Sequence, residues 1–323
     1  MMNPVLEVHD LGLSFDSSNP QGPGMSGVSF TLQPGHVLGV VGESGSGKTS
    51  LARALVGLRP TRTGHIMLMG QRLPADGAMS RDLRRQVQMV FQNPVASLDP
   101  RMTILQSLEE PLRVHHGEMD ARQRLVRAVE VLDMVGLPSL TVSGYPHQFS
   151  GGQCQRIAIA RALMVQPALL ICDEVVSALD VSVQAQVLNL LMSLQRELGL
   201  AMVFISHDLA VVRHICDQVA VIYRGGLLEQ GEAVALCAHP AHPYTRDLLA
   251  AVPGARVGAG RPAPPAADQM DSGCSYRHRC DLATQACVER VPQLGPRMDL
   301  TPDRQVACHH PLASGQPSGP VGL

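Results

Sequence analysis

The segment Gly42–Thr49, Gly-Glu-Ser-Gly-Ser-Gly-Lys-Thr, is the feature that most constrains the fold of this chain of 323 residues. It follows a short apolar run, Val37–Val41, and precedes an apolar pattern with helical spacing. Glycines at such a place let backbone N–H groups surround a phosphate, and the start of the helix adds partial positive charge. Lys48 can reach the β- and γ-phosphates of a nucleoside triphosphate, and the Thr49 hydroxyl can bind Mg²⁺. The motif therefore predicts an α/β fold of the phosphate-loop class.

The composition excludes several other classes. Hydrophobic residues make up 45% of the chain and charged residues 17%, which excludes a wholly disordered protein. The net charge of −2 gives no support for a general nucleic-acid-binding surface. The longest apolar runs, such as Leu200–Ile205, are far shorter than the ~18 residues of a membrane span. The N-terminus lacks the basic flank and apolar core of a signal peptide, so we expect a cytoplasmic protein.

Residues 1 to about 235 alternate short apolar runs with helical patterns, which predicts βαβ units and a mainly parallel sheet. Four runs are apolar almost throughout, as expected for strands buried on both faces. These are Val37–Val41, Val87–Phe91, Ala168–Cys172 and Ala201–Ile205.

The domain organisation follows from the segments between and after these runs. Residues 93 to about 165 contain no equally clear strand and carry helical patterns, for example Asp120–Val135, so they predict a helical insertion. We therefore expect a phosphate-loop domain at residues 1–253 and a Gly-, Ala- and Pro-rich linker at 254–270. A small cysteine-bearing module at 271–311 and a disordered tail at 312–323 would follow.

Polar residues follow each predicted strand, and the carboxyl ends of parallel strands bind ligands at one edge of an open sheet. This edge would gather Lys48, Thr49, Gln92, Asp173, Glu174 and His207. Asp173 can hold Mg²⁺, and Glu174 can orient or deprotonate an attacking water. Gln92 can contact the metal and the water, and His207 the γ-phosphate. Taken singly, such a histidine is more often structural and such an aspartate a helix cap, but the set suits hydrolysis of a nucleoside triphosphate.

A second Gly-rich element, Ser150-Gly151-Gly152-Gln153, opens a clear helical pattern. Ser150 suits the N-cap of that helix, and the two glycines permit close approach of a ligand to the backbone. Alone this element could be only a capped helix.

Together these residues resemble the ATP-binding cassette (ABC) ATPases of membrane transporters, with Gly42–Thr49 as the phosphate loop and Ser150–Gln153 as the signature. Ser177–Asp180 matches the family's dimer-contact loop and His207 its switch histidine. The resemblance implies Glu174 as the catalytic base, assisted by Gln92 and His207, and Mg²⁺ held by Thr49, Gln92 and Asp173. It also implies that two cassettes enclose ATP. The ATP contacts that it implies are Phe15, Gly42, Ser44, Gly45, Gly47, Lys48, Thr49, Ser50, Ser150, Gly151, Gly152, Gln153 and Asp180.

Phe15 falls where an aromatic ring stacks on adenine in this family, although a phenylalanine in an early strand is more often a core residue. Two positions depart from the family pattern: Val175 replaces the proline usual after the catalytic glutamate, and Cys154 stands where arginine is common. Neither change removes a ligand or a base, so we expect activity.

A narrower resemblance, to the oligopeptide/dipeptide/nickel importers, is carried by Gln92–Arg101, Gly144–Phe149, His242–Pro253 and the C-terminal cysteines. It implies an ATP-hydrolysing subunit that drives import of peptides or a similar small solute. Its partners would be two transmembrane permease subunits, a second ATPase subunit and, indirectly, an extracytoplasmic solute-binding protein, with no nucleic acid. The chain would be peripheral at the cytoplasmic face of the inner membrane.

Cys274, Cys280, Cys287 and Cys308 lie within one short module that has little apolar sequence to fold around. Domains of about 40 residues usually need a metal or disulfides, and the expected compartment disfavours disulfides. Four thiolates suit an iron–sulfur cluster or zinc, and a tail without metal also remains open. His278, His309 and His310 are alternative ligands. The importer resemblance implies a 4Fe–4S cluster on the four cysteines.

Two other functions remain open at this point. One is a soluble ABC-type ATPase acting on nucleic acid or the ribosome, although such proteins typically carry two cassettes, a long coiled coil or zinc-finger insertions. The other is an inactive regulatory subunit, against which the presence of Glu174 and His207 argues. The sequence does not name the solute, nor does it show whether the second ATPase subunit is a copy or a paralogue.

Overall fold

The computed structural model describes residues 3–16, 19, 22, 24–251, 272–296 and 303–312. The predicted linker at 254–270 and the predicted tail, apart from Leu312, lie outside the described residues.

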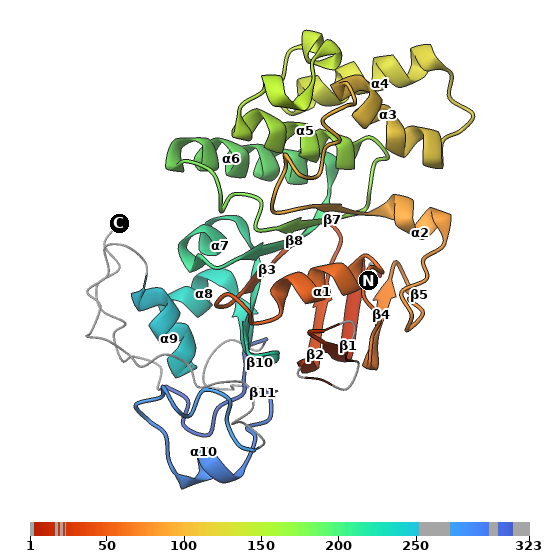
Figure 1. Ribbon diagram of the computed structural model, residues 1–323. Helices are drawn as coiled ribbons and strands as arrows, with labels where there is room; N and C mark the ends of the chain where they lie inside the picture. The colour runs from red at the N-terminus through yellow and green to blue at the C-terminus, as the bar shows by residue number, and fades with distance from the viewer. Residues whose placement is uncertain are drawn as a thin grey trace.

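The core of the fold is an eight-stranded mixed sheet with the order β11-β12-β10-β9-β3-β8-β7-β6 (Figure 1). Strands β6, β7, β8, β3 and β9 are mutually parallel, and β10, β12 and β11 continue the sheet in antiparallel pairs. Their bounds are β3 Val37–Val41, β6 Val87–Val90, β7 Leu169–Asp173, β8 Ala201–Ser206, β9 Gln218–Tyr223, β10 Gly226–Glu232, β11 Gly295–Pro296 and β12 Gln305–Val306. The four predicted strands are β3, β6, β7 and β8, each within one residue of its predicted ends.

The continuous apolar runs are explained by burial on both faces of this sheet. Every residue of β3, β7 and β8 is buried. Successive side chains of a strand enter two different hydrophobic clusters: Val40 packs on one face, whereas its neighbour Val41 packs on the other. A strand covered on both faces has no solvent side for polar residues, so its sequence does not alternate.

A second sheet, antiparallel and four-stranded, covers one face of the main sheet and was not predicted. It has the order β2-β1-β4-β5, with β1 Leu6–Ser14, β2 Gly24–Leu32, β4 Thr63–Leu68 and β5 Gln71–Arg72. Its apolar side chains share one cluster with helix α1 (Lys48–Leu55) and the main sheet. The expectation of βαβ units from residue 1 onward is therefore wrong for this part of the chain.

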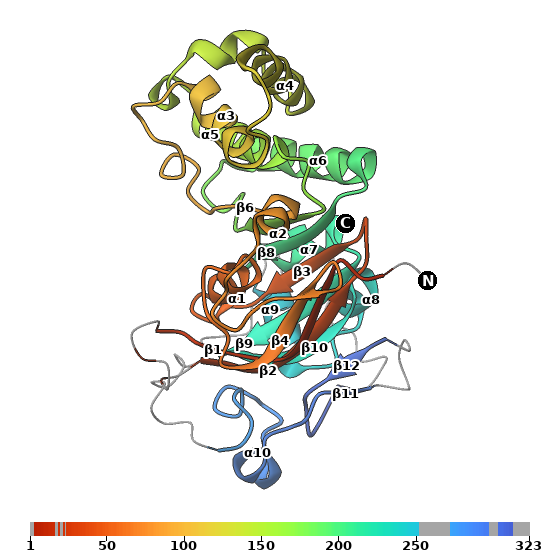
Figure 2. The same ribbon diagram turned by 90° about the vertical axis from the view of Figure 1, so that its right-hand side faces the viewer.

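Residues 93–165 contain helices and no strand, as predicted. The helices are α3 Ile104–His115, α4 Ala121–Met134, η1 Ser139–Ser143, η2 Pro146–Gln148 and α5 Gly151–Leu163. They form a layer at one end of the molecule, at the top of both views (Figures 1 and 2). Capping boxes at Thr103, Asp120 and Ser150 start α3, α4 and α5, because each side chain accepts from the N3 backbone N–H while the N3 glutamine bonds back.

The other helices flank the main sheet or follow it. They are α2 Arg81–Gln86, α6 Val181–Leu198, α7 Leu209–Ile215, α8 Ala233–Ala238, α9 Pro243–Ala250 and α10 Gln285–Glu289. Residues 272–296 and 303–312, here called the C-terminal segment, lie at the end of the molecule opposite to α3, α4 and α5 (Figure 2). Within the described part of the chain, no helix combines the length and the apolar character needed to span a membrane.

The prediction of a 4Fe–4S cluster, or of zinc, on Cys274, Cys280, Cys287 and Cys308 is wrong. All four cysteines are among the described residues, and within these residues no three or more His, Cys, Asp or Glu side chains are grouped so that they could hold a metal ion. Burial raises the pKa of the thiols of Cys274, Cys280 and Cys308, that of Cys308 to about 12.

The physical reason for the error is that the C-terminal segment does not have to supply its own core. Cys274, Tyr276 and Cys287 are buried in the same hydrophobic cluster as Tyr223 and Tyr244 of the preceding chain. Strand β12 also pairs with β10, which extends the main sheet. Apolar burial against an existing fold needs fewer large side chains than an independent domain of this length.

Candidate functional site

The phosphate loop joins the carboxyl end of β3 to α1 and is shaped by its glycines. Gly45 and Gly47 adopt φ values of 79° and 105°, which L side chains rarely reach. Gly42 has a different reason, since a Cβ there would lie 2.1 Å from the carbonyl oxygen of Ile222 in β9. The loop therefore approaches a neighbouring strand more closely than any side chain would allow.

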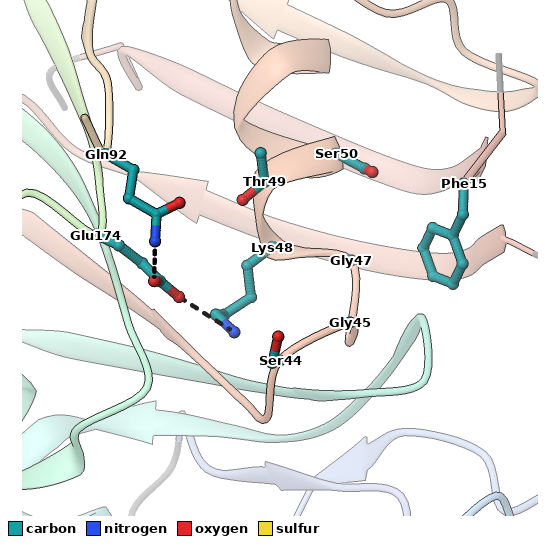
Figure 3. A pocket seen from close by; sticks show the side chains of 9 residues that line it. All are labelled: Phe15, Ser44, Gly45, Gly47, Lys48, Thr49, Ser50, Gln92 and Glu174. Carbon is teal, nitrogen blue, oxygen red and sulfur yellow. Dashed lines mark hydrogen bonds and ion pairs between the residues drawn. The ribbon is translucent and has the colours of Figure 1, made fainter. Parts of the chain in front are cut away.

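Lys48 is the first residue of α1 and only 4% exposed. Its Nζ donates to the carbonyl oxygens of Gly42 at 2.7 Å and Glu43 at 3.0 Å, and lies 3.8 Å from Oε1 of Glu174 (Figure 3). Burial lowers the pKa of Lys48, while the neighbouring carboxylates of Glu174, Asp173 and Glu43 oppose that shift. The ammonium is thus held over the loop by acceptors from the loop itself.

Thr49 and Asp173 form a pair of oxygen donors beside Lys48. The Thr49 hydroxyl donates to Oδ1 of Asp173 at 3.3 Å, and Asp173 ends β7 with 3% exposure. Burial raises the pKa of Asp173, and the hydrogen bond from Thr49 opposes the rise. A hydroxyl and one carboxylate suit Mg²⁺, which is usually bound by one or two carboxylates together with substrate phosphates. The residues present fit the predicted ion.

Glu174 contacts three of the other predicted residues. Its Oε2 accepts from Nε2 of Gln92 at 2.9 Å, and its Oε1 lies 3.8 Å from both Lys48 Nζ and His207 Nδ1. Figure 3 shows the side chains of Gln92 and Lys48 pointing at this carboxylate. Glu174 has a φ of 47°, an uncommon conformation for this residue type, which turns the chain sharply at the end of β7. His207 is 59% exposed, so it faces the open side.

Lys48, Thr49, Gln92 and Glu174 line one cavity at the sheet edge, together with Phe15 and the loop, whereas Asp173 and His207 contact this lining from outside it. Its lining is Phe15, Ser44, Gly45, Gly47, Lys48, Thr49, Ser50, Gln92 and Glu174 (Figure 3). The ring of Phe15 packs on the phosphate loop, since a Cβ on Gly47 would lie 2.6 Å from the ring. Phe15 therefore lines the cavity, and its partly buried side chain also packs against the cluster formed by the antiparallel sheet, α1 and the main sheet.

The structure does not bring the signature residues into this cavity. Ser150 caps α5, and Gly152 packs so closely on α6 that a Cβ would lie 2.4 Å from a methyl carbon of Val183. Ser150, Gly151 and Gln153 are exposed, and so is Asp180, which stands at the N-cap position of α6. The predicted site residues thus fall into two groups within one chain.

The two departures from the family pattern are both buried. Val175 is 1% exposed and packs in the hydrophobic cluster around β7. Cys154 is fully buried in α5, where its thiol donates to the carbonyl oxygen of Pro146 at 3.5 Å. Neither side chain lines the cavity.

Three residues at the phosphate loop were missed by the sequence analysis. The backbone N–H of Glu43 donates to the hydroxyl of Tyr244 at 2.9 Å, and both carboxylate oxygens of Glu43 accept from Arg279 at 2.8 Å. Glu43 occupies a variable position inside the loop motif, and its partners are more than 200 residues away. No spacing pattern connects them.

Comparisons with known proteins agree with this geometry. The family model "ABC transporter" matches residues 25–177, and the model "Oligopeptide/dipeptide transporter, C-terminal region" matches residues 228–287. The "Di/tripeptide transport ATP-binding protein DppF" of Pseudomonas aeruginosa is 45% identical over 322 residues, covering 96% of this chain and 98% of that protein. The "Oligopeptide transport ATP-binding protein OppF" of Escherichia coli is 44% identical over 311 residues, covering 90% and 92%. Both names are those of ATP-binding proteins and mention no metal cluster.

Solved structures give the same fold. The structure of cbiO1 from Clostridium perfringens, part of the ABC transporter complex cbiONQ, has a TM-score of 0.63 at 26% identity, covering 72% of this chain and 89% of that one. The dimeric ATP-binding cassette MJ0796 bound to ADP and Pi has a TM-score of 0.62 at 26% identity, covering 71% and 98%. With relatives 45% identical over nearly its whole length, this chain belongs to the ABC transporter family and has the C-terminal region typical of oligopeptide/dipeptide transporters.

Proposed function

We propose that this chain is the ATP-hydrolysing subunit of an ABC importer for di- or oligopeptides or a similar small solute. The observation that carries the ATPase is the convergence of Lys48, Gln92 and His207 on the Glu174 carboxylate, directly beside the Thr49–Asp173 pair. The peptide class is supported by the names of the relatives, all transport proteins, and by the C-terminal family model. None of these names supports an ATPase acting on nucleic acid or the ribosome.

The roles of the residues follow from their places in the cavity or directly beside it. The loop N–H groups and the Lys48 ammonium bind the β- and γ-phosphates, and Phe15 stacks on the adenine. Thr49 and Asp173, with Gln92, hold Mg²⁺, which when bound neutralises phosphate charge. Glu174 orients the attacking water and accepts its proton, and His207, on the open side, contacts the γ-phosphate.

The separation of the signature from the cavity supports a dimer of ATPase subunits. The exposed residues Ser150, Gly151, Gln153 and Asp180, with Gly152, would meet the triphosphate bound to a second subunit. Each site would then be completed by residues of the partner, a copy or a paralogue. This arrangement makes hydrolysis depend on association of the two subunits.

The predicted partners and location follow from the same proposal. The ATPase domain would occupy residues 1–253, with its helical subdomain at about 93–165. It would lie at the cytoplasmic face of the inner membrane and drive two permease subunits, which an extracytoplasmic protein supplies with solute. The segment Gln92–Arg101 links the site to α3 and carries the exposed Val95, so it suits contact with a permease.

The test is the variant Glu174→Gln. It keeps the size and the hydrogen bond to Gln92 but removes the base, so we expect turnover to fall by about 10²–10⁴-fold with ATP affinity retained. Lys48→Ala should instead weaken ATP binding itself. Glu197→Gln, at an exposed glutamate near the end of α6, is the matched control and should leave both quantities unchanged. Undiminished hydrolysis by Glu174→Gln would exclude Glu174 as the base.

A further inference from the structure

Residues near the C-terminus contact the phosphate loop, and their contacts meet at Glu43. Both carboxylate oxygens of Glu43 accept from Nη1 of Arg279 at 2.8 Å, across 236 residues of sequence. The side chains of Arg279 and Glu43 are 15% and 35% exposed. A charged hydrogen-bonded pair with this burial is stronger than a surface ion pair.

The backbone of Glu43 is held on both sides as well. Its N–H donates to the hydroxyl of Tyr244 in α9 at 2.9 Å. Its carbonyl oxygen accepts from Nζ of Lys48 at 3.0 Å. Glu43, whose carbonyl oxygen is one of the two that hold the Lys48 ammonium, therefore also binds α9 and the C-terminal segment.

The partners of Glu43 are themselves fixed in place. Tyr244 and Tyr276 are each 1% exposed and pack with Tyr223 at the end of β9, with ring centroids 4.6 to 5.3 Å apart. The guanidinium of Arg279 lies over the Tyr276 ring, 5.7 Å from its centroid. The Tyr276 hydroxyl bonds to Asp247 of α9. Arg279 thus approaches Glu43 from a packed aromatic cluster and not from a loose surface loop.

We propose that Arg279 is a positioning residue for ATP binding, which holds Glu43 so that the Glu43 carbonyl aims the Lys48 ammonium at the β- and γ-phosphates. Docking of the C-terminal segment and binding of ATP then favour each other, since coupling between two sites is reciprocal. The proposal rests on the proposed ATP site and adds to it a segment outside the cavity. It assigns the C-terminal segment a part in nucleotide affinity.

The test measures MgATP binding by titration calorimetry and steady-state hydrolysis in full-length variants. Arg279→Gln should raise the Kd for MgATP about tenfold, within the range common for coupled sites, and raise KM more than it lowers kcat. Glu43→Gln should have a similar effect, and the double variant should be no worse than either single one, because both remove the same contact. Arg279→Lys keeps a positive charge near Glu43 and should restore most of the affinity.

The matched control is Arg277→Gln. Arg277 lies in the same segment but donates to the carbonyl oxygens of Ser272 and Cys274, so its loss should leave the Kd for MgATP within twofold. Thermal unfolding without nucleotide reports whether each variant is folded. Tyr244→Phe keeps the packed ring, removes the acceptor of the Glu43 N–H and should also raise the Kd, so the test does not depend on Arg279→Gln folding.

Two results would overturn the proposal. One is a Kd within twofold of the parent for Arg279→Gln, Glu43→Gln and Tyr244→Phe alike. The other is an equal loss of affinity in Arg277→Gln, which would show a general loosening of the segment. A parent protein that binds no MgATP would instead overturn the proposed function, on which this inference depends.

Discussion

The buried ion pair of Glu229 and Arg304 makes the clearest prediction about what holds the C-terminal segment in place. Arg304, next to β12, donates from Nε and Nη2 to Oε1 of Glu229 at 3.1 and 2.5 Å, and from Nη2 to the carbonyl oxygen of His239 at 2.8 Å. Glu229 in β10 also accepts from the N–H groups of Ala241 and His242. Arg304 is 1% exposed and Glu229 is fully buried.

The change Arg304→Met removes the charge but keeps most of the apolar stem. It leaves the Glu229 carboxylate buried with only its two backbone donors and leaves the His239 carbonyl without the guanidinium. Breaking a buried pair in this way costs about 3–5 kcal/mol of unfolding free energy. For a fold of this size the expected fall in Tm is roughly 10 °C.

The assay is urea unfolding followed by circular dichroism, with Glu229→Gln and the double variant completing a mutant cycle. The double variant should be less destabilised than the sum of the two single ones, because neither charge remains unpaired. Arg290→Met, at an exposed arginine of the same segment, is the control and should change stability by less than about 0.5 kcal/mol. A loss below about 1 kcal/mol in Arg304→Met, or simple additivity in the cycle, would refute the reasoning.

Two further predictions concern acid stability and membrane coupling. Burial lowers the pKa of His242 to about 3. Below pH 6.5 this histidine therefore binds a proton in the unfolded chain but stays neutral in the folded chain. The unfolding free energy should consequently fall by about 2 kcal/mol between pH 7 and pH 5. His242→Asn should flatten that slope in urea titrations while the exposed His278→Asn should not, and equal slopes in all three proteins would exclude His242. Cysteines placed at Ser97–Met102 should crosslink to a permease subunit, and substitutions there should impair transport more than basal hydrolysis; crosslinks arising only from the C-terminal segment would contradict this coupling route.

The parts of the fold that could be predicted from sequence are those whose signal is local. Strands β3 and β7 are apolar throughout because both faces of each are covered, and the helix starts at Asp120 and Ser150 carry their own capping residues. The phosphate loop is equally local, since its glycines and Lys48 are contiguous. The edge that gathers Gln92 and Glu174 then follows from the rule for parallel sheets.

The antiparallel sheet has no such signal. The burial pattern of β1 is irregular, because its pairing with β2 and β4 shifts register, so neither strict alternation nor a continuous apolar run marks it. The prediction of a metal-bound C-terminal module was wrong for a different reason. The prediction assumed that the few apolar residues of the C-terminal segment had to form a core by themselves. Tyr276 and Cys287 are instead buried against the tyrosines of β9 and α9.

The shape of the phosphate loop depends on residues that follow His207 in the chain. The carbonyl oxygen of Ile222 abuts Gly42, the N–H of Gly225 donates to the Ser46 carbonyl at 3.0 Å, and Tyr244 accepts from Glu43. The β9–β10 hairpin and α9 therefore support the phosphate loop by direct contact, and the C-terminal segment adds a further contact through Arg279. A loop whose N–H groups must all point at the phosphates binds the nucleotide more weakly if it has many conformations. Rigid elements that hold the loop in one conformation therefore increase nucleotide affinity without touching the nucleotide. The β9–β10 hairpin and α9 contribute no residue to the cavity lining, and we infer for this reason that they affect ATP binding only through the phosphate loop that they contact.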